Sequence, residues 1–109
     1  PAADGVMISQ VMPPPTANKF PIIAEYQKAM KAAGAADLSY TSLEGYIAAK
    51  VLVEALRRGG DASREALVKA LEGLRVDLGG FTATFGADNH NASKFVEMTV
   101  LNKNGDVRY

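Results

Sequence analysis

The sequence predicts an α/β fold in which one strand and a proline-rich connector precede three helices and a terminal β-meander. Three observations support this prediction. Apolar residues recur every three to four positions from residue 21 to about residue 74, which is the helical period. They alternate with polar residues from 76 to 85, which is the period of a strand. Asn104-Gly105 is a turn signal typical of a hairpin between two strands.

The first strand is expected within residues 5–12 (GVMISQVM), which alternate loosely and contain β-branched side chains. Pro13, Pro14 and Pro15 follow at once. Because proline has no backbone N–H and a fixed φ, these residues end the strand and form a stiff, extended connector.

Two of the helices have clear limits. The first is expected from Pro21 to Gly34, since proline suits the first helical turn and glycine favours the end. Its apolar face consists of Ile22, Tyr26, Ala29, Met30 and Ala33. The third is expected to begin at Ser63 as N-cap, with Glu65 in its first turn. Its apolar residues are Leu67, Leu71 and Leu74.

The second helix is expected over residues 41–60 (TSLEGYIAAKVLVEALRRGG). Thr41 and Glu44 have the spacing of a capping box, in which each side chain binds a backbone N–H at the helix start. Arg57-Arg58 complement the helix dipole, and Gly59-Gly60 supply the left-handed stop. The apolar stripe is wide enough to predict contacts on two sides: Ile47, Ala48, Val51, Leu52, Ala55 and Leu56.

A β-rich segment is expected after the third helix. Gly79-Gly80 indicate a bend or bulge at the start of a strand. Residues 86–94 form a polar turn, and residues 95–102 (FVEMTVLN) a further strand. Asn104-Gly105 return the chain into residues 106–109. The residues expected on one face of the strand after the glycines are Phe81, Ala83 and Phe85.

Composition excludes several classes of protein. The 109 residues suffice for one domain, and twelve basic residues balance twelve acidic ones. Nothing in this balance favours nucleic acid or an anionic membrane. The absence of cysteine excludes a disulfide framework, thiolate zinc and a thiol nucleophile. Lys50 and Glu54 interrupt the longest apolar run, which falls short of the roughly 20 residues of a spanning helix.

No metal site, cofactor site or catalytic site is predicted. His90 is the single histidine, and no strong ligands stand at the spacing a metal would need. Gly79-Gly80 do not make a dinucleotide loop, which needs G-x-G-x-x-G after a strand. None of the three serines with neighbouring polar groups stands in a G-x-S-x-G elbow: Ser42, Ser63 and Ser93.

Five stretches of the chain stand out in order: GVMISQVMPPPT, YQKAMKAAG, SYTSLEGYIAAKVLVEALRRGG, LVKALEGL and DLGGFTATFGADNHNASKFVEMTV. In this order they resemble the C-terminal part of periplasmic binding proteins of the branched-chain amino acid type, the type I extracytoplasmic solute receptors of ABC transporters. The likeness runs from Gly5 to Arg108, and its specificity comes from the order and spacing of the stretches.

This resemblance implies two α/β lobes joined by three chain crossings, with the ligand in the cleft between them. Residues 1–109 would form a single C-terminal fragment, cut from a larger protein. Residues 5–20 would supply a strand and a crossing, residues 21–78 the helical part of one lobe, and residues 79–109 a crossing and strands of the other lobe. The expected hinge residues are Pro13, Pro14, Pro15, Gly79 and Gly80.

The resemblance also implies a function. The protein would be a periplasmic receptor that delivers an amino acid or a small carboxylate, including aromatic ones, to an ABC permease. The residues expected to contact the ligand are Tyr40, Thr41, Ser42 and Glu44, at the start of the second helix. A hydroxyl there can donate to a carboxylate, and a tyrosine can stack on an apolar tail. Capping and packing also explain these residues, and we favour that interpretation over ligand contact, which stays open.

A second function class is a sensor or protein-association module. The wide stripe of the second helix and the unfinished sheet leave apolar surface and strand edges uncovered. On this hypothesis the 109-residue chain forms a dimer or a higher oligomer.

Overall fold

The structure, a computed structural model, describes residues 2–35, 37–60 and 63–108. It contains three helices and five strands within these ranges. In chain order they are β1 (Met7–Gln10), α1 (Pro21–Ala32), α2 (Tyr40–Gly59), α3 (Arg64–Glu72), β2 (Arg75–Asp77), β3 (Thr82–Thr84), β4 (Glu97–Leu101) and β5 (Val107–Arg108).

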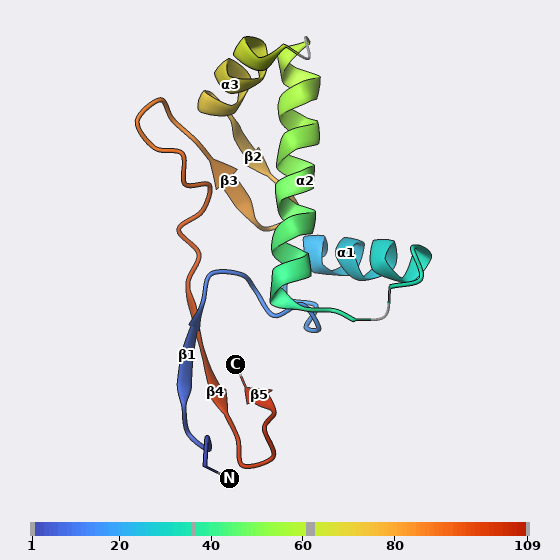
Figure 1. Cartoon of the computed structure of the whole chain (residues 1–109), viewed down its shortest axis with the longest axis vertical. Coiled ribbons are helices and arrows are strands. Elements are labelled where there is room, and N and C mark those ends of the chain that lie inside the picture. The colour runs from blue at the N-terminus through green and yellow to red at the C-terminus, as the bar shows by residue number, and fades with distance from the viewer. Residues whose placement is uncertain (1, 36, 61–62, 109) are drawn as a thin grey trace.

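The elements form two parts (Figure 1). The helical part holds α1, α2, α3 and the antiparallel hairpin of β2 and β3. The terminal sheet holds three antiparallel strands in the order β1-β4-β5. Two stretches of chain join the parts: residues 11–20, called the first connection, and residues 85–96, called the second connection. The molecule is elongated, 52 × 34 × 20 Å, because the sheet extends away from the helices.

The limits of α1 and α3 agree with the sequence. Pro21 is the first residue of α1, and Gly34, just beyond its end, has a left-handed φ of 74°. Ser63 is the N-cap of α3, and its hydroxyl accepts a hydrogen bond from the backbone N–H of Ala66. These signals act within one turn of chain, so they hold wherever the helix packs.

The predicted capping box of α2 is wrong. The N-cap is Ser39, whose hydroxyl accepts from the N–H of Ser42, while the Ser42 hydroxyl accepts from the N–H of Ser39. The helix begins at Tyr40, so Glu44 lies beyond the third helical position from which a side chain reaches back to the cap. The predicted left-handed glycine at the end of α2 is confirmed. Gly60 has a φ of 65°, and its N–H donates to the carbonyl of Leu56.

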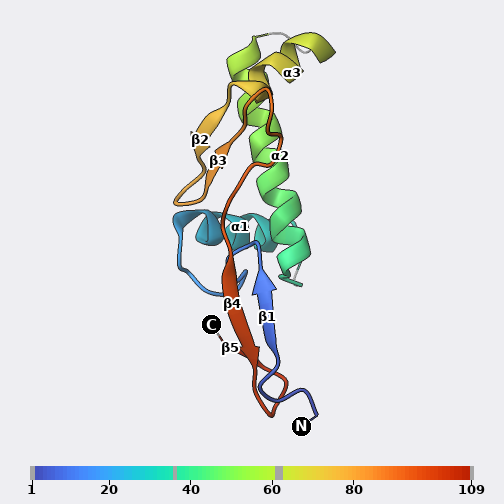
Figure 2. The same cartoon turned by 90° about the vertical axis from the view of Figure 1, so that its left-hand side faces the viewer.

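The core lies in the helical part and combines one face of α2 with α1 and the hairpin. Figure 2 shows β2 and β3 running along α2, with α1 across its N-terminal half. α2 also packs against α3, but two residues of the stripe predicted to make contacts, Leu52 and Leu56, remain 44% and 38% exposed. The buried residues are Ile22, Ile23, Tyr26, Leu43, Ile47, Val51, Ala55, Leu74, Leu78, Phe81 and Ala83.

The prediction that Gly79-Gly80 lead into a crossing between the lobes is wrong. They turn β2 back into β3. Their φ angles are +100° and +87°, and Asp77 Oδ1 accepts both of their N–H groups, at 2.9 and 2.6 Å. Val76 pairs with Ala83 across the hairpin. The chain therefore stays with the helices until residue 84 and leaves them only in the second connection.

The terminal sheet confirms the predicted first strand and meander. β1 pairs with β4 with Met7 opposite Val100, and β4 pairs with β5. The N–H of Gly105 donates to the carbonyl of Asn102 in the turn between β4 and β5, and Gly105 has a φ of 83°.

Candidate functional site

The candidate site is a groove of about 530 Å³ beside the N-terminal half of α2, where both connections pass. We call it the connection groove. It brings together α2, Phe81 just before β3, and parts of the first and second connections. Its lining residues are Val11, Met12, Glu44, Ile47, Ala48, Val51, Phe81, Phe85, His90, Asn91, Ala92 and Ser93.

Tyr26 of α1 holds the first turn of α2 in place by hydrogen bonds to its capping residues. Its ring is fully buried, and its hydroxyl shares a hydrogen bond of 2.5 Å with the Ser42 hydroxyl. The backbone N–H of Ser39 also donates to the Tyr26 hydroxyl, at 3.2 Å. The capping residues of α2 are thus held by a side chain from another helix, which positions the first turn relative to α1.

The structure separates the four residues predicted to contact ligand. The Ser42 hydroxyl is engaged in the cap and with Tyr26. Tyr40 is half-buried and Thr41 is exposed at the helix start, and neither lines the groove. Glu44 does line it, and within the described ranges its carboxylate has no hydrogen bond or ion pair. Since Ser39 and Ser42 satisfy the cap, the carboxylate of Glu44 is left for another partner.

The groove combines this carboxylate with an apolar wall. Ile47, Phe81 and Phe85 supply part of the wall, and the first connection adds Val11 and Met12. A carboxylate beside a large apolar surface suits an ammonium group that carries an apolar substituent.

Most of the lining residues were not predicted. Nothing in the local pattern of residues 90–93 indicates that they pass beside α2. The one usable signal was the triple proline, which places a connection directly after Val11 and Met12.

His90 lines the connection groove, and its Nε2 lies 3.4 Å from Glu72 Oε1. In the described part of the chain, no three His, Asp or Glu residues are grouped so as to hold a metal ion.

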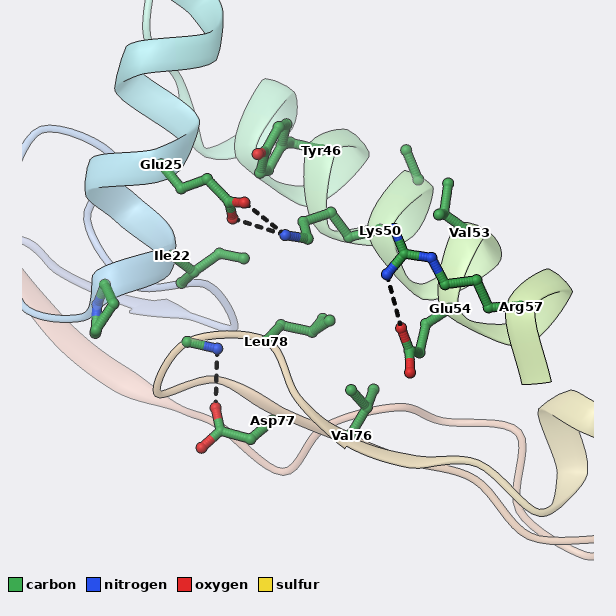
Figure 3. A pocket seen from close by; sticks show the side chains of 13 residues that line it. Ile22, Glu25, Tyr46, Lys50, Val53, Glu54, Arg57, Val76, Asp77 and Leu78 are labelled. Carbon is green, nitrogen blue, oxygen red and sulfur yellow. Dashed lines mark hydrogen bonds and ion pairs between the residues drawn. The ribbon is translucent and has the colours of Figure 1, made fainter.

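A second groove, of about 720 Å³, lies on the other side of α2, between α1 and β2 (Figure 3). Its floor is apolar, with Ile22, Val76 and Leu78. Its rim is charged, but Lys50 Nζ lies 2.7 Å from Glu25 Oε1. Because its basic and acidic groups already pair with each other, this groove offers less to a charged solute than the free Glu44 carboxylate does.

Tyr46 in the second groove gives the protein a predicted pH dependence. Burial, and next the Glu25 carboxylate, raise the pKa of Tyr46 above its ordinary value near 10. As the pH rises, Tyr46 therefore ionises at lower pH in the unfolded state than in the folded state. The stability that this difference in pKa provides is complete below about pH 10 and is lost as the pH rises through the folded pKa.

We expect the free energy of unfolding of Tyr46→Phe to fall less steeply than that of the wild type between about pH 9 and 11. Urea unfolding at a series of pH values measures it. Glu25→Gln should reduce the slope partly, because burial remains when the carboxylate is removed. Identical slopes for wild type and Tyr46→Phe would contradict the prediction.

The groove offers a free carboxylate beside an apolar wall, an arrangement that suits the binding of a small molecule. The chain belongs to the periplasmic binding protein family, whose family model matches residues 1–106. Its fold is the α/β fold of type I periplasmic binding proteins.

Solved structures support this assignment. A substrate-binding periplasmic protein from Ralstonia solanacearum is 40% identical, with a TM-score of 0.82 over 97% of this chain and 31% of that one. An extracellular ligand-binding receptor from Verminephrobacter eiseniae is 31% identical, with a TM-score of 0.84 over 98% and 31%. A possible leucine/isoleucine/valine-binding protein from Rhodopirellula baltica is 33% identical, with a TM-score of 0.83 over 98% and 30%.

The chain thus spans about 30% of the length of these proteins. They are named as receptors or binding proteins, and none as an enzyme. No curated protein matches the chain significantly. None of its described helices is long and apolar enough to cross a membrane.

Proposed function

We propose that this chain is part of an extracytoplasmic, periplasmic receptor that binds an amino acid or a small carboxylate, including aromatic ones, and delivers it to the permease of an ABC transporter. The observation that carries the proposal is the free carboxylate of Glu44 in the connection groove, beside an apolar wall and between two chain connections. The family and the names of the similar structures support it.

In this proposal each end of the ligand has a partner. Glu44 pairs with the ammonium group, while an apolar side chain packs against Ile47 and Phe81. The ligand carboxylate lies at the start of α2, where the helix dipole favours an anion. The exposed hydroxyl of Thr41 donates to it, and Tyr40 stacks on the solute from the same turn. Ser42 supports the site through the cap.

The two connections act as the hinge. The helical part forms one lobe, and the terminal sheet belongs to the other. Pro13, Pro14 and Pro15 are buried in the first connection and limit its motion, since their φ angles are fixed. The second connection, residues 85–96, takes the hinge role that the sequence suggested for Gly79 and Gly80.

A thermal-shift screen of the encoded polypeptide that contains these residues tests the proposal. The panel holds aliphatic amino acids, aromatic carboxylates and short amides. A ligand at a hundred times its dissociation constant should stabilise the protein by about 2.7 kcal/mol.

Glu44→Gln should raise the dissociation constant of an amino acid by about tenfold or more. Removal of one partner of a charged pair typically costs at least about 1.4 kcal/mol. The substitution should not change the binding of a carboxylate ligand that has no amino group. Glu65→Gln, an exposed change in the first turn of α3, is the matched control. A folded protein that no member of the panel stabilises would overturn the proposal.

A second role, self-association, is favoured by a separate observation. Leu52, Val53 and Leu56 of α2 are 38–50% exposed, and among the described residues β1 pairs with a strand on one side only. Exposed apolar surface and open strand edges are common sites of protein association. In this role the 109-residue chain forms a dimer or a higher oligomer.

A further inference from the structure

The first connection is attached to the helical part along most of its length. The three prolines, residues 13–15, are buried, and the side-chain amide of Gln27 in α1 donates to the carbonyl of Pro15, at 2.9 Å. At the end of this connection, Phe20 is the N-cap of α1. Residues 11–12 are therefore the short stretch between β1 and the part of this connection that is fixed to the helices.

The second connection is attached to the helical part close to its own end. The ring of Phe95 lies edge-on to that of Phe20, with centroids 6.1 Å apart, and 6.0 Å from the ring of Phe81 in the core. Val96 separates Phe95 from β4. The chain thus passes from the helical part into the terminal sheet through residues 11–12 and residue 96, which we call the bending segments.

An ion pair joins the two sides of the bending segments. Lys19, two residues before α1, pairs its ammonium group with the carboxylate of Glu97, the first residue of β4. The side chains of Lys19 and Glu97 are 35% and 23% exposed, so solvent screens this pair less than a fully exposed one.

The carboxylate of Glu97 depends on this pair. Its second oxygen, Oε2, is buried and has no hydrogen-bond partner among the residues that the structure describes. A carboxylate that is partly removed from water is stable only when it is paired, so the loss of Lys19 would leave a charge that favours a more solvated position. For Glu97 such a position requires the terminal sheet to move relative to the helical part.

We propose that Lys19 and Glu97 form a latch that holds the terminal sheet in one orientation relative to the helical part, and that the chain bends at the bending segments when the latch opens. Neither residue lines the connection groove, so both are positioning residues that act on a bound solute only through the arrangement of the two parts. The inference rests on the proposed hinge role of the connections and not on the identity of the solute.

Distances between two spin labels test the latch in the encoded polypeptide that contains these residues, without solute. Glu65→Cys in α3 and Lys103→Cys in the turn between β4 and β5 are exposed positions for the labels, one in each part. Pulsed electron paramagnetic resonance gives the distribution of distances between them. Lys19→Met should broaden this distribution. Glu97→Gln should broaden it as well, and the double variant should be no broader than either single one, because both changes break the same contact.

Two further variants separate the latch from a general loss of stability. Lys19→Glu combined with Glu97→Lys keeps an ion pair between the same positions and should restore the narrow distribution. Lys50→Met is the matched control, because Lys50 is similarly exposed (34%) but pairs with Glu25 inside the helical part. It should leave the distribution unchanged. Circular dichroism checks that each variant is folded.

The latch is wrong if folded Lys19→Met and Glu97→Gln give a distribution as narrow as that of the wild type. Equal broadening by Lys50→Met would also overturn it, since that result would not depend on a contact across the bending segments. If Lys19→Met does not fold, Glu97→Gln and the exchanged pair give the same test. No solute takes part in this measurement, so the latch and the solute-binding proposal can each fail alone.

Discussion

Replacing Tyr26 by alanine should destabilise the protein by about 3–5 kcal/mol, the usual cost of removing a buried aromatic side chain. Tyr26 is fully buried and packs edge-on against Tyr46, with ring centroids 5.6 Å apart. The substitution leaves a cavity between α1 and α2, and it also removes the hydroxyl that binds Ser39 and Ser42. The free energy of unfolding of a domain is commonly about 5–15 kcal/mol, so the substitution would remove a large part of it.

Urea unfolding measures this effect, and Tyr26→Phe separates its two parts. The phenylalanine keeps the ring and removes only the hydroxyl, which should cost about 1–3 kcal/mol because the capping serines lose a buried partner. If Tyr26→Ala lay within about 1 kcal/mol of the wild type, the ring would not be the packing link between the two helices.

Replacing Gly79 by alanine should destabilise the protein by about 3 kcal/mol, through two effects that act together. Gly79 has a φ of +100°, which side chains with a Cβ rarely adopt. The added Cβ would also lie 2.9 Å from the backbone nitrogen of Ile22. The carbonyl of Gly79 accepts a hydrogen bond from that N–H, so a shift that relieves the clash disturbs the start of α1.

Gly105→Ala is the matched control. Its φ of +83° is similarly unfavourable, but a Cβ there has no neighbour within 4 Å. It should therefore cost only the strain, about 1–2 kcal/mol. Urea unfolding of the two variants measures the difference. Equal losses would show that the contact between the β2–β3 turn and α1 adds nothing to the strain.

The features that the sequence determined are those decided within a few residues. Pro21 starts α1, Ser63 caps α3 and Gly60 ends α2, because each acts on backbone groups in its own turn. Asn104-Gly105 made the last hairpin predictable for the same reason. Of the four residues predicted to contact ligand, Glu44 is the one that lines the connection groove, and its contact with a ligand stays a prediction.

Other features were decided by tertiary structure. Ser39 and Thr41 could both cap α2, and the buried hydroxyl of Tyr26, from another helix, favours the register that uses Ser39. β2 and β3 have three residues each, too few for a strong pattern, and they depend on pairing with each other and packing on α2.

The connection groove depends on packing as well. Glu44 stands on α2, while residues 90–93 reach the groove through a connection whose course no local periodicity encodes. Sequence alone therefore determined where helices begin and end and where the last hairpin turns. Which hydroxyl caps α2, where the glycine pair turns, and what faces Glu44 were decided by contacts between segments far apart in the chain, because only folding brings those groups within reach of one another.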